Sequence, residues 1–264
     1  MTAPIVSDPI DRPESSSLLG VPLHLVDLGQ VLQYMEEWIH RRNRCHWIYH
    51  ANSHGITEAH KHAMFMEVLK SADLSLVDGK VTNWFVSHRA SRPFPHVRAA
   101  DLLLGFCRIA NSKGYTNFFY GDTAEVLSLM AEKLLRDFPS LRIAGVYSPP
   151  FRELTAEEDT RITEMINRAN PDVLWVGLGL PKQEKWIYGH LDKLKVPVVA
   201  AVGVTFRFVS GKVDAPPAWV SSSGLEWLWR FAHQPRRLWH RVIVYGPQFV
   251  GLSLLELTGI KNFK

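Results

Sequence analysis

Cysteine and long hydrophobic stretches are both scarce in this chain of 264 residues. Its two cysteines, Cys45 and Cys107, exclude a disulfide scaffold and disfavour a zinc site built on cysteine. The longest uncharged run near the C-terminus, Val242–Leu255, has 14 residues, whereas a helix needs about 20 to cross a bilayer. With 46% apolar residues, the composition is that of a folded globular protein rather than a disordered one.

Several targeting and nucleotide-binding motifs are also missing. Residues 1–17 are rich in proline, serine and aspartate and contain no apolar segment, so they are predicted to form a flexible leader rather than a signal peptide. A cytoplasmic location is the default expectation. The chain has no G-x-x-x-x-G-K-[ST] and no G-x-S-x-G pattern, which disfavours P-loop kinases and α/β-hydrolases.

Positive charge is concentrated in the last quarter of the sequence. Residues 205–264 contain eight lysines and arginines against three acidic residues, a net charge of +5, while the whole chain carries +4. The first 204 residues therefore carry a net charge of −1. This asymmetry predicts an anionic partner for the C-terminal segment: a phosphate, a nucleic acid or a lipid surface.

Short apolar runs alternate with amphipathic segments up to residue 204. The expected strands are His46–Tyr49, Leu74–Val77, Asn117–Tyr120, Arg142–Tyr147, Val173–Gly177 and Val196–Val202. The expected helices are Leu28–Arg41, Ile56–Ser71, Ala99–Ser112, Ala124–Phe138, Ala156–Asn170 and Pro181–Leu194. This order predicts an α/β protein with a doubly wound, mostly parallel sheet over residues 18–204, followed by a helical, basic appendage over 205–264.

Ligands of such sheets bind beyond the carboxyl ends of the strands, so the polar residues that follow each predicted strand are the candidate site. Asp78 follows one strand and precedes Gly79. Its carboxylate could act as a general base for a hydroxyl group, or it could simply cap a helix that starts near Lys80. The residue pattern alone leaves both interpretations open.

A glycine turn, Gly177-x-Gly179, precedes the helix predicted to start at Pro181. Such a turn offers free backbone N–H groups and a positive helix end, which suit a diphosphate. Position 182 is lysine rather than the third glycine of G-x-G-x-x-G, so an NAD-linked oxidoreductase is disfavoured. The twelve histidines show no metal-ligand spacing, and no metal site is predicted.

Tryptophans and arginines are interleaved in the basic appendage. Arg230, Arg237 and Arg241 are spaced by seven and four residues and could share one helical face. Three interpretations remain open: binding of a phosphate-bearing ligand at a membrane surface, stacking of single-stranded nucleic acid on tryptophan, and a solvated basic face over a tryptophan core.

Taken together, the motifs resemble those of the WecG/TagA/CpsF glycosyltransferases, glycosyltransferase family 26, from about Val21 to Arg241. The residues that carry the resemblance are Asp78-Gly79, Arg98-Ala99-Ala100-Asp101, Gly177-Leu178-Gly179-x-Pro181-Lys182-Gln183-Glu184-Lys185-Trp186-Ile187, Gly203-x-x-Phe206, Ser210-Gly211-Lys212, Ala215-Pro216, Leu225-Glu226-Trp227-x-x-Arg230 and Gln234-Pro235-Arg236-Arg237.

The resemblance implies a Rossmann-like core and an inverting transferase that needs no metal or other cofactor. Such an enzyme moves a hexose, of the N-acetylmannosamine type or related, from a UDP-sugar to a sugar on polyprenyl diphosphate during surface-polymer synthesis. The resemblance further implies a peripheral position on the inner face of the cell membrane, reached through the appendage, and no nucleic-acid partner. A homo-oligomer is compatible with the sequence, which does not define the oligomeric state.

The site residues are carried over from the same resemblance. Asp78 matches the catalytic base, Asn52 a sugar-binding asparagine and Gln183 a glutamine that helps to bind the nucleotide sugar. The other residues assigned to substrate binding are His50, Arg98, Asp101, Gly177, Gly179, Lys182 and Glu184, together with Arg230, Arg237 and Arg241, which are expected near the diphosphates.

Three positions depart from the family pattern. His50 stands where the family often has threonine, Arg207 where it usually has aspartate, and Asp214 where it commonly has arginine. Our hypothesis for the last two is one exchanged charge pair, with Arg207 bonded to Asp214. An alternative that these departures leave open is a non-catalytic nucleotide-sugar-binding or scaffold protein of the same fold.

Overall fold

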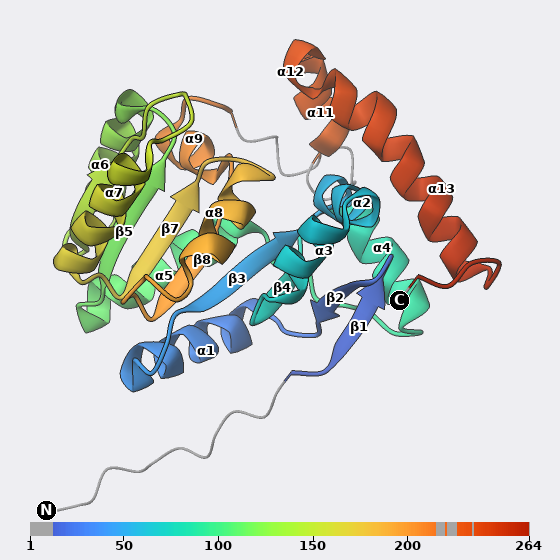
Figure 1. Ribbon diagram of the computed structural model, residues 1–264, viewed down its shortest axis with the longest axis horizontal. Helices are drawn as coiled ribbons and strands as arrows, with labels where there is room; N and C mark the ends of the chain where they lie inside the picture. Colours follow the sequence, from blue (N-terminus) through green and yellow to red (C-terminus); the bar gives the residue numbers. More distant parts are fainter. Residues whose placement is uncertain (1–12, 215–219, 221–225, 234, 264) are drawn as a thin grey trace, which may run out of the picture.

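A six-stranded, wholly parallel sheet runs through the centre of the protein (Figure 1). The computed structural model describes residues 13–214, 220, 226–233 and 235–263. The strands are β3 (His46–Ala51), β4 (Leu74–Val77), β5 (Thr116–Gly121), β6 (Arg142–Tyr147), β7 (Val173–Gly177) and β8 (Val198–Ala201). Their order across the sheet is β4-β3-β8-β7-β5-β6. The chain forms β3 and β4 on one side, crosses to β5 and β6 on the other, and fills the middle with β7 and β8. With helices on both faces of a parallel sheet, this is the Rossmann-like, doubly wound α/β fold that the sequence predicted.

Helices cover both faces of the sheet (Figure 1). One face carries α2 (Ser53–Lys61), α3 (Ala63–Lys70), α7 (Ala156–Ala169) and α8 (Lys182–His190). The other carries α1 (Leu28–Arg41), α5 (Ala99–Lys113), α6 (Ala124–Asp137) and α9 (Thr205–Ser210).

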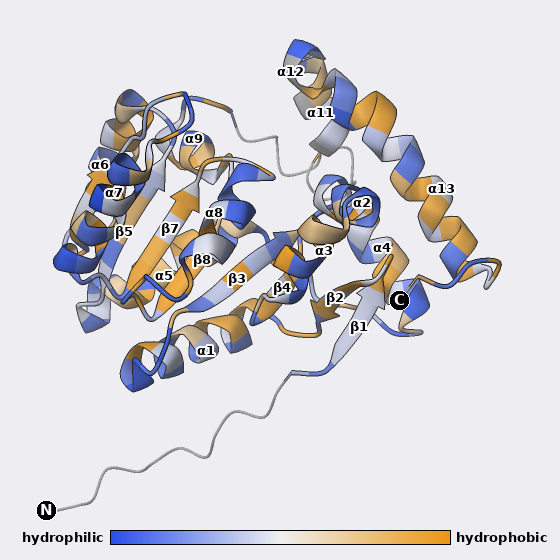
Figure 2. Ribbon diagram, in the orientation of Figure 1, coloured by the Kyte–Doolittle hydropathy of each residue, from blue (hydrophilic) through white to orange (hydrophobic). Residues whose placement is uncertain are grey.

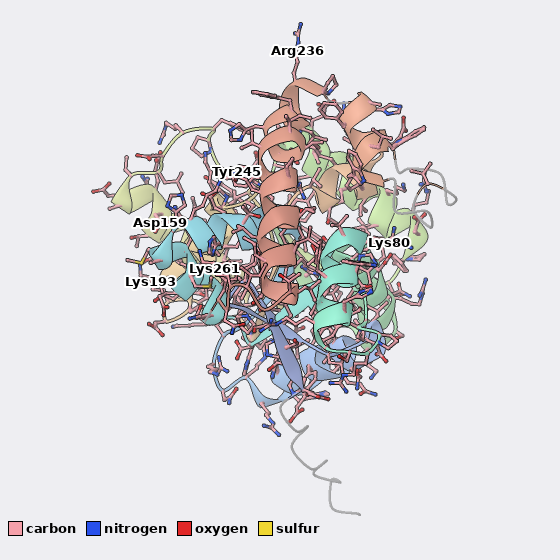
Figure 3. The ribbon with its side chains drawn as sticks, turned by 90° about the vertical axis from the view of Figure 1, so that its right-hand side faces the viewer. Lys80, Asp159, Lys193, Arg236, Tyr245 and Lys261 are labelled. Carbon is pink, nitrogen blue, oxygen red and sulfur yellow. The ribbon has the colours of Figure 1, made fainter. Side chains whose placement is uncertain are left out.

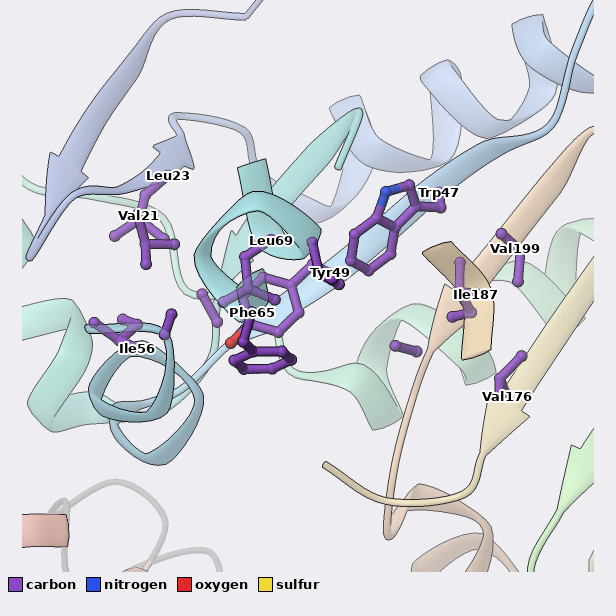
Figure 4. Close-up of a cluster of buried hydrophobic side chains, with 14 of the residues drawn as sticks. Val21, Leu23, Trp47, Tyr49, Ile56, Phe65, Leu69, Val176, Ile187 and Val199 are labelled. Atoms are coloured by element: carbon purple, nitrogen blue, oxygen red, sulfur yellow. The ribbon is translucent and has the colours of Figure 1, made fainter. Parts of the chain in front are cut away.

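Two hydrophobic clusters, one on each face, hold these layers together. Alternate residues of one strand enter opposite clusters, as Trp175 and Val176 of β7 do. Figure 4 shows the first cluster, in which Tyr49 of β3 lies beside Phe65 of α3. Burial on both faces explains why the strands read as continuous apolar runs.

The carboxyl ends of the parallel strands lie along one side of the sheet, called the rim below. Ala51 at the end of β3 lies opposite Val77 at the end of β4, and Gly121 of β5 lies opposite Gly177 of β7. A Cβ on Gly121 would lie 2.5 Å from the carbonyl carbon of Gly177. Only glycine therefore allows the ends of β5 and β7 to approach this closely.

The C-terminal segment packs beside α2 and α4 (Lys80–Arg89), as Figures 1 and 3 show. It consists of α11 (Glu226–His233), α12 (Pro235–Trp239), the π-helical η1 (His240–Tyr245) and α13 (Gly246–Leu257). Phe249 is fully buried, with its ring 5.6 Å from that of Phe85 in α4. Glu256 accepts a hydrogen bond from the backbone N–H of Leu19 at 2.9 Å. The last helix is thus part of the main hydrophobic cluster.

Some elements differ from the sequence-based expectation. The helix predicted over Ile56–Ser71 is two helices, because His62 is extended (φ −130°, ψ 102°). The helix predicted to begin at Pro181 begins at Lys182, with Pro181 at its N-cap position. The hairpin of β1 (Ser15–Leu18) and β2 (Val21–His24) was not predicted, and it starts within the segment expected to be a leader. Among the described helices, none is long and apolar enough to cross a membrane.

Candidate functional site

Asp78 stands at the rim, directly after β4. Its backbone N–H donates to the carbonyl oxygen of Ala51 at 2.8 Å, which ties it to the end of β3. The N-cap residue of α4 is Gly79, at φ +99°, and no side chain of the described residues caps this helix. Asp78 is therefore not a helix cap, and its side chain, about a third exposed, is oriented by other contacts. Its role as a base stays a prediction.

His96 faces Asp78, and sequence reasoning missed it. Its Nε2 lies 3.8 Å from Oδ1 of Asp78 and accepts a hydrogen bond from the N–H of Gly79 at 2.9 Å. His96 lies on the segment between α4 and α5, where no periodic pattern gives a signal. Its proximity to Asp78 became visible only once the segment was placed against β4.

His50 and Asn52 lie at the end of β3. His50 is buried, its Nδ1 donates to the carbonyl oxygen of Ala201 at 3.0 Å, and its Nε2 has no hydrogen-bond partner among the described residues. Burial lowers the pKa of the His50 ring. Asn52 caps α2, since its Oδ1 accepts from the N–H of Gly55 at 3.1 Å. No hydrogen bond joins its amide NH₂ group to another residue of the described ranges.

Gln183 joins two glycine turns of the rim. Its Oε1 accepts hydrogen bonds from the backbone N–H groups of Gly179 at 3.1 Å and Gly203 at 3.0 Å. The expectation that the turn offers free N–H groups is therefore wrong for Gly179, because the side chain four residues later occupies its N–H group. Gln183 is buried, so in this conformation it organises the turns rather than projecting into solvent.

Glu184 lies beneath these turns. Its Oε1 accepts from Nε2 of Gln183 at 2.8 Å, while its Oε2 is buried without a hydrogen-bond partner among the described residues. Burial raises the pKa of the Glu184 carboxyl to about 7. The hydroxyl of Tyr49 is likewise buried without a described partner, and burial, followed by the charge of Glu184, raises the pKa of that phenol.

A cavity of about 590 Å³ opens at the β5–β7 end of the rim. Gly177, Gly179 and Lys182 line it, so three of the residues predicted to bind substrate come together there. The other lining residues come from β5 and the turn after it, the loop before α7, the first turn of α7, the turn after β7, α8, the turn after β8 and α9. They are Tyr120, Asp122, Pro149, Pro150, Phe151, Arg152, Glu153, Leu154, Thr155, Ala156, Leu178, Asp159, Trp186, Gly203, Val204 and Arg207.

Arg207 and Asp122 both line this cavity and are bonded to each other. Its Nε donates to Oδ2 at 2.8 Å and its Nη2 to Oδ1 at 3.0 Å, and these bonds raise the pKa of the guanidinium group. The hypothesis of a charge pair with Asp214 is therefore wrong. The true partner is 85 positions away in the sequence, beyond the reach of reasoning from neighbouring residues.

An aromatic wall closes another side of the cavity. Trp186 of α8 lies 4.7 Å from the ring of Tyr120. Asp159 fixes this wall, because it accepts from Nε1 of Trp186 at 3.0 Å and lies 2.7 Å from Nε2 of His190. Figure 3 labels Asp159 on the side of the molecule away from Lys80 of α4.

Arg98 and Asp101 form a bidentate pair in the first turn of α5, with two hydrogen bonds of 2.7 Å. They follow His96 along the chain but do not line the cavity. No group of three or more His, Cys, Asp or Glu within the described ranges is arranged to hold a metal ion.

Of the three appendage arginines, Arg241 is the one whose surroundings the structure describes. It lies in η1, and its charge acts on Tyr49 and on His54 of α2. Burial, with Arg241 as the second cause, lowers the pKa of His54 to about 4. Arg230 lies in α11 and Arg237 in α12, but their side chains are outside the described part of the structure.

Comparisons with known proteins support the sequence resemblance. The family described as "Glycosyl transferase WecG/TagA/CpsF family" matches residues 16–262. The chain is 29% identical over 199 residues to an N-acetylglucosaminyldiphosphoundecaprenol N-acetyl-beta-D-mannosaminyltransferase of Bacillus subtilis (strain 168), covering 75% of each chain. A protein of the same name from Bacillus spizizenii is 29% identical, and the match covers 82% of each chain. Another from Staphylococcus aureus (strain NCTC 8325) is 25% identical, and the match covers 81% of this chain and 82% of the relative.

Proposed function

Because the chain belongs to the WecG/TagA/CpsF family and is a glycosyltransferase, we propose that it moves a hexose from a UDP-sugar to a sugar carried on polyprenyl diphosphate. The observation that carries the proposal is the position of Asp78. Its carboxylate lies at the same edge of the sheet as the cavity and caps no helix. Two strand spacings, about 10 Å, separate β4 from β8, and Gly203 after β8 lines the cavity.

The donor nucleotide fits the cavity. Lys182 and Arg207 supply positive charge to a diphosphate there, and Asp122 holds the Arg207 guanidinium in place. Trp186 and Tyr120 offer aromatic surface for the nucleobase. The sugar then extends along the rim from Gly203 toward β3 and β4.

Asp78 serves as the general base of a single displacement. It removes the proton from the acceptor hydroxyl while the acceptor oxygen bonds to the anomeric carbon and the bond from that carbon to UDP breaks. Attack on the face opposite the leaving diphosphate inverts the anomeric configuration. Asn52 orients the acceptor or donor sugar, and Arg241 of η1 adds positive charge near His54 of α2.

The lipid part of the acceptor requires contact with a membrane, and α13 offers a surface for it. Val250 and Leu254 of α13 and Ile243 of the preceding η1 are each more than a third exposed, and Figure 2 shows hydrophobic colour along α13. Arg236 and Lys261 lie toward opposite ends of the segment (Figure 3). An apolar face between cations suits the anionic surface of the inner leaflet.

The reaction is tested by UDP release. A panel of UDP-hexoses is incubated in detergent with a lipid-diphosphate-linked N-acetylglucosamine, and the wild type is compared with Asp78→Asn. We expect acceptor-dependent release with one donor, reduced about 1000-fold in the variant, while UDP affinity measured by calorimetry stays within twofold. UDP binding without release from any donor, over several acceptor lengths and sugars, would support the non-catalytic alternative.

The membrane contact is tested separately by cosedimentation with anionic vesicles. Leu254→Gln together with Val250→Gln should lower the bound fraction several-fold. Val146→Gln is the matched control, because Val146 is equally exposed but lies on β6. Equal binding of both variants and the wild type would refute a lipid-facing α13.

A further inference from the structure

The outward side of α4 is apolar, and this helix begins two residues beyond Asp78. The inward side of α4 packs into the fold, where Phe85 and Val86 are buried. On the outward side Val81 is 39% exposed and Trp84 is 49% exposed. Residues three positions apart share one face of a helix, so these two side chains form one outward stripe. About half of the largest side chain of α4 is thus left uncovered by the described residues.

Exposed apolar side chains are concentrated on α4 and on the C-terminal helices. Of the sixteen most exposed large hydrophobic side chains among the described residues, ten belong to α4 or to residues 226–263. They are Val81, Trp84, Trp227, Leu228, Trp239, Ile243, Val250, Leu254, Leu255 and Ile260. α4 and α13 lie side by side on the face turned to the viewer in Figure 3, and they meet where Phe85 contacts Phe249. The outward sides of the two helices therefore border one surface.

Acidic side chains are missing from the outward sides of α4 and α13. The sequence of α4 contains no aspartate or glutamate, and neither does residues 227–255. Glu256, the one acid of α13, is buried and lies 3.5 Å from Nη1 of Arg89 in α4. Lys80 at the start of α4 and Lys261 beyond α13 are exposed. An apolar surface that is bordered by cations and lacks exposed acids matches the anionic headgroups of a bilayer.

We infer that the outward side of α4 docks on an anionic bilayer together with α13, so that the membrane surface lies next to Asp78. This inference rests on the proposed function, in which the acceptor sugar is carried on a membrane lipid. Since α4 leaves the rim directly after Gly79, a helix seated on the headgroups keeps the base close to the layer where the acceptor sugar emerges. Trp84 contributes most, because tryptophan rings settle at the boundary between headgroups and acyl chains.

The charges of this surface favour a bilayer over a second copy of the chain. In a symmetric dimer the same patch of each protomer faces itself. Cations such as Lys80 and Lys261 would then face cations, with no exposed acid on α4 or α13 to balance them. An anionic membrane provides that balance.

The test places an environment-sensitive NBD fluorophore on α4 of the full-length protein. Cys45 and Cys107 are buried, and burial raises the pKa of both thiols to about 12. A thiol introduced by Trp84→Cys is therefore the one that reacts with the label. We expect its emission to rise several-fold and to shift to the blue on vesicles of phosphatidylglycerol and phosphatidylcholine. Leu254→Cys on α13 should respond in the same way. Leu135→Cys, at an exposed position of α6 at the other end of the sheet (Figure 1), should not respond.

Two further measurements keep the side chain itself in view. In vesicle cosedimentation, Trp84→Gln should lower the bound fraction several-fold, whereas Trp84→Phe, which keeps an apolar ring, should bind within twofold of the wild type. Leu135→Gln is the matched control and should bind like the wild type. With the lipid-linked acceptor in vesicles, Trp84→Gln should raise the KM for the acceptor about tenfold and leave kcat unchanged. With a short-chain acceptor in detergent, the variant and the wild type should agree.

Three outcomes would overturn docking through α4. The first is a label at position 84 that vesicles leave unchanged. The second is a signal at position 84 that depends on protein concentration without vesicles, which assigns the surface to a second copy. The third is equal vesicle binding of Trp84→Gln and the wild type. Absence of UDP release in the wild type would refute the proposed function instead, and the label and cosedimentation would still test the docking.

Discussion

The two ends of the rim are built in different ways. At the cavity end, polar side chains are held in pairs: Arg207 bonds Asp122, and Oδ2 of Asp159 lies 2.7 Å from Nε2 of His190. At the other end, Asp78 is partly exposed, and buried polar atoms such as Nε2 of His50 have no partner among the described residues. The cavity end is thus preorganised, whereas the Asp78 end has hydrogen-bonding capacity left over.

This contrast suits the two substrates proposed for the site. A soluble nucleotide sugar needs a rigid, charged pocket that exists before it arrives. An acceptor attached to lipid approaches the more exposed Asp78 end, which the C-terminal helices border. The next three experiments test this contrast.

Removing the ring of Phe249 should have the largest effect, because the Asp78 end depends on the C-terminal helix. Phe249→Ala leaves a cavity against Phe85 and should lower the free energy of unfolding by about 3–4 kcal/mol in urea denaturation. The neighbouring Val250→Ala, at an exposed position, should cost less than about 1 kcal/mol. Equal losses would mean that α13 is not part of the core.

Neutralising Glu184 tests whether its buried carboxyl, beneath the glycine turns of the rim, holds a proton in the folded protein. Its pKa is raised from 4.5 to about 7 in the folded protein, so between these values the folded state keeps a proton that the unfolded chain has released. Wild-type stability should therefore fall by up to about 3 kcal/mol as pH rises through this window, and Glu184→Gln should remove that fall. Unfolding at pH 4.5 and pH 8 measures it.

The control for Glu184 is Glu67→Gln, at an exposed position of α3. It should keep the wild-type dependence on pH. If Glu184→Gln also keeps that dependence, the Glu184 carboxyl is not the group that holds the proton.

The smallest effect is expected at the cavity end. Arg207→Met combined with Asp122→Asn removes the ion pair without leaving a buried charge behind, and the UDP dissociation constant should rise about tenfold, or about 1.4 kcal/mol. Lys212→Met removes a cation bonded to Glu125 outside the cavity and should leave the UDP affinity unchanged. A double variant that binds UDP like the wild type would refute a role for Arg207 in donor binding.

The sheet could be predicted because its strands are buried on both faces. A run such as Val173–Gly177 is apolar at nearly every position, and the polar residues after it mark the rim. The same rule brought Gly177, Gly179 and Lys182 to one cavity. The break at His62 was not predictable, since neither proline nor glycine occurs there.

The hydrogen-bond partners of the site residues were harder to predict than their location at the rim. Asn52 and Gln183 lie at the rim as expected, yet one caps α2 and the other bonds two glycine turns. Arg207 was assigned to a neighbour in the sequence and bonds Asp122 instead. The position of His96 follows from a segment between α4 and α5, in which the carbonyl oxygen of Phe94 accepts a hydrogen bond from Nδ2 of Asn83 in α4. Such contacts join residues far apart in the chain, and one sequence contains no pattern that reports them.

The burial of Phe249 against Phe85 also has a consequence for synthesis of the protein. About 160 residues separate the two rings in the chain, and ribosomes add roughly 5–20 residues per second. The apolar side of α4 therefore waits roughly 10–30 s for the helix that covers it. During that interval the nascent chain presents an uncovered hydrophobic surface, and surfaces of this kind make an incomplete fold prone to aggregation.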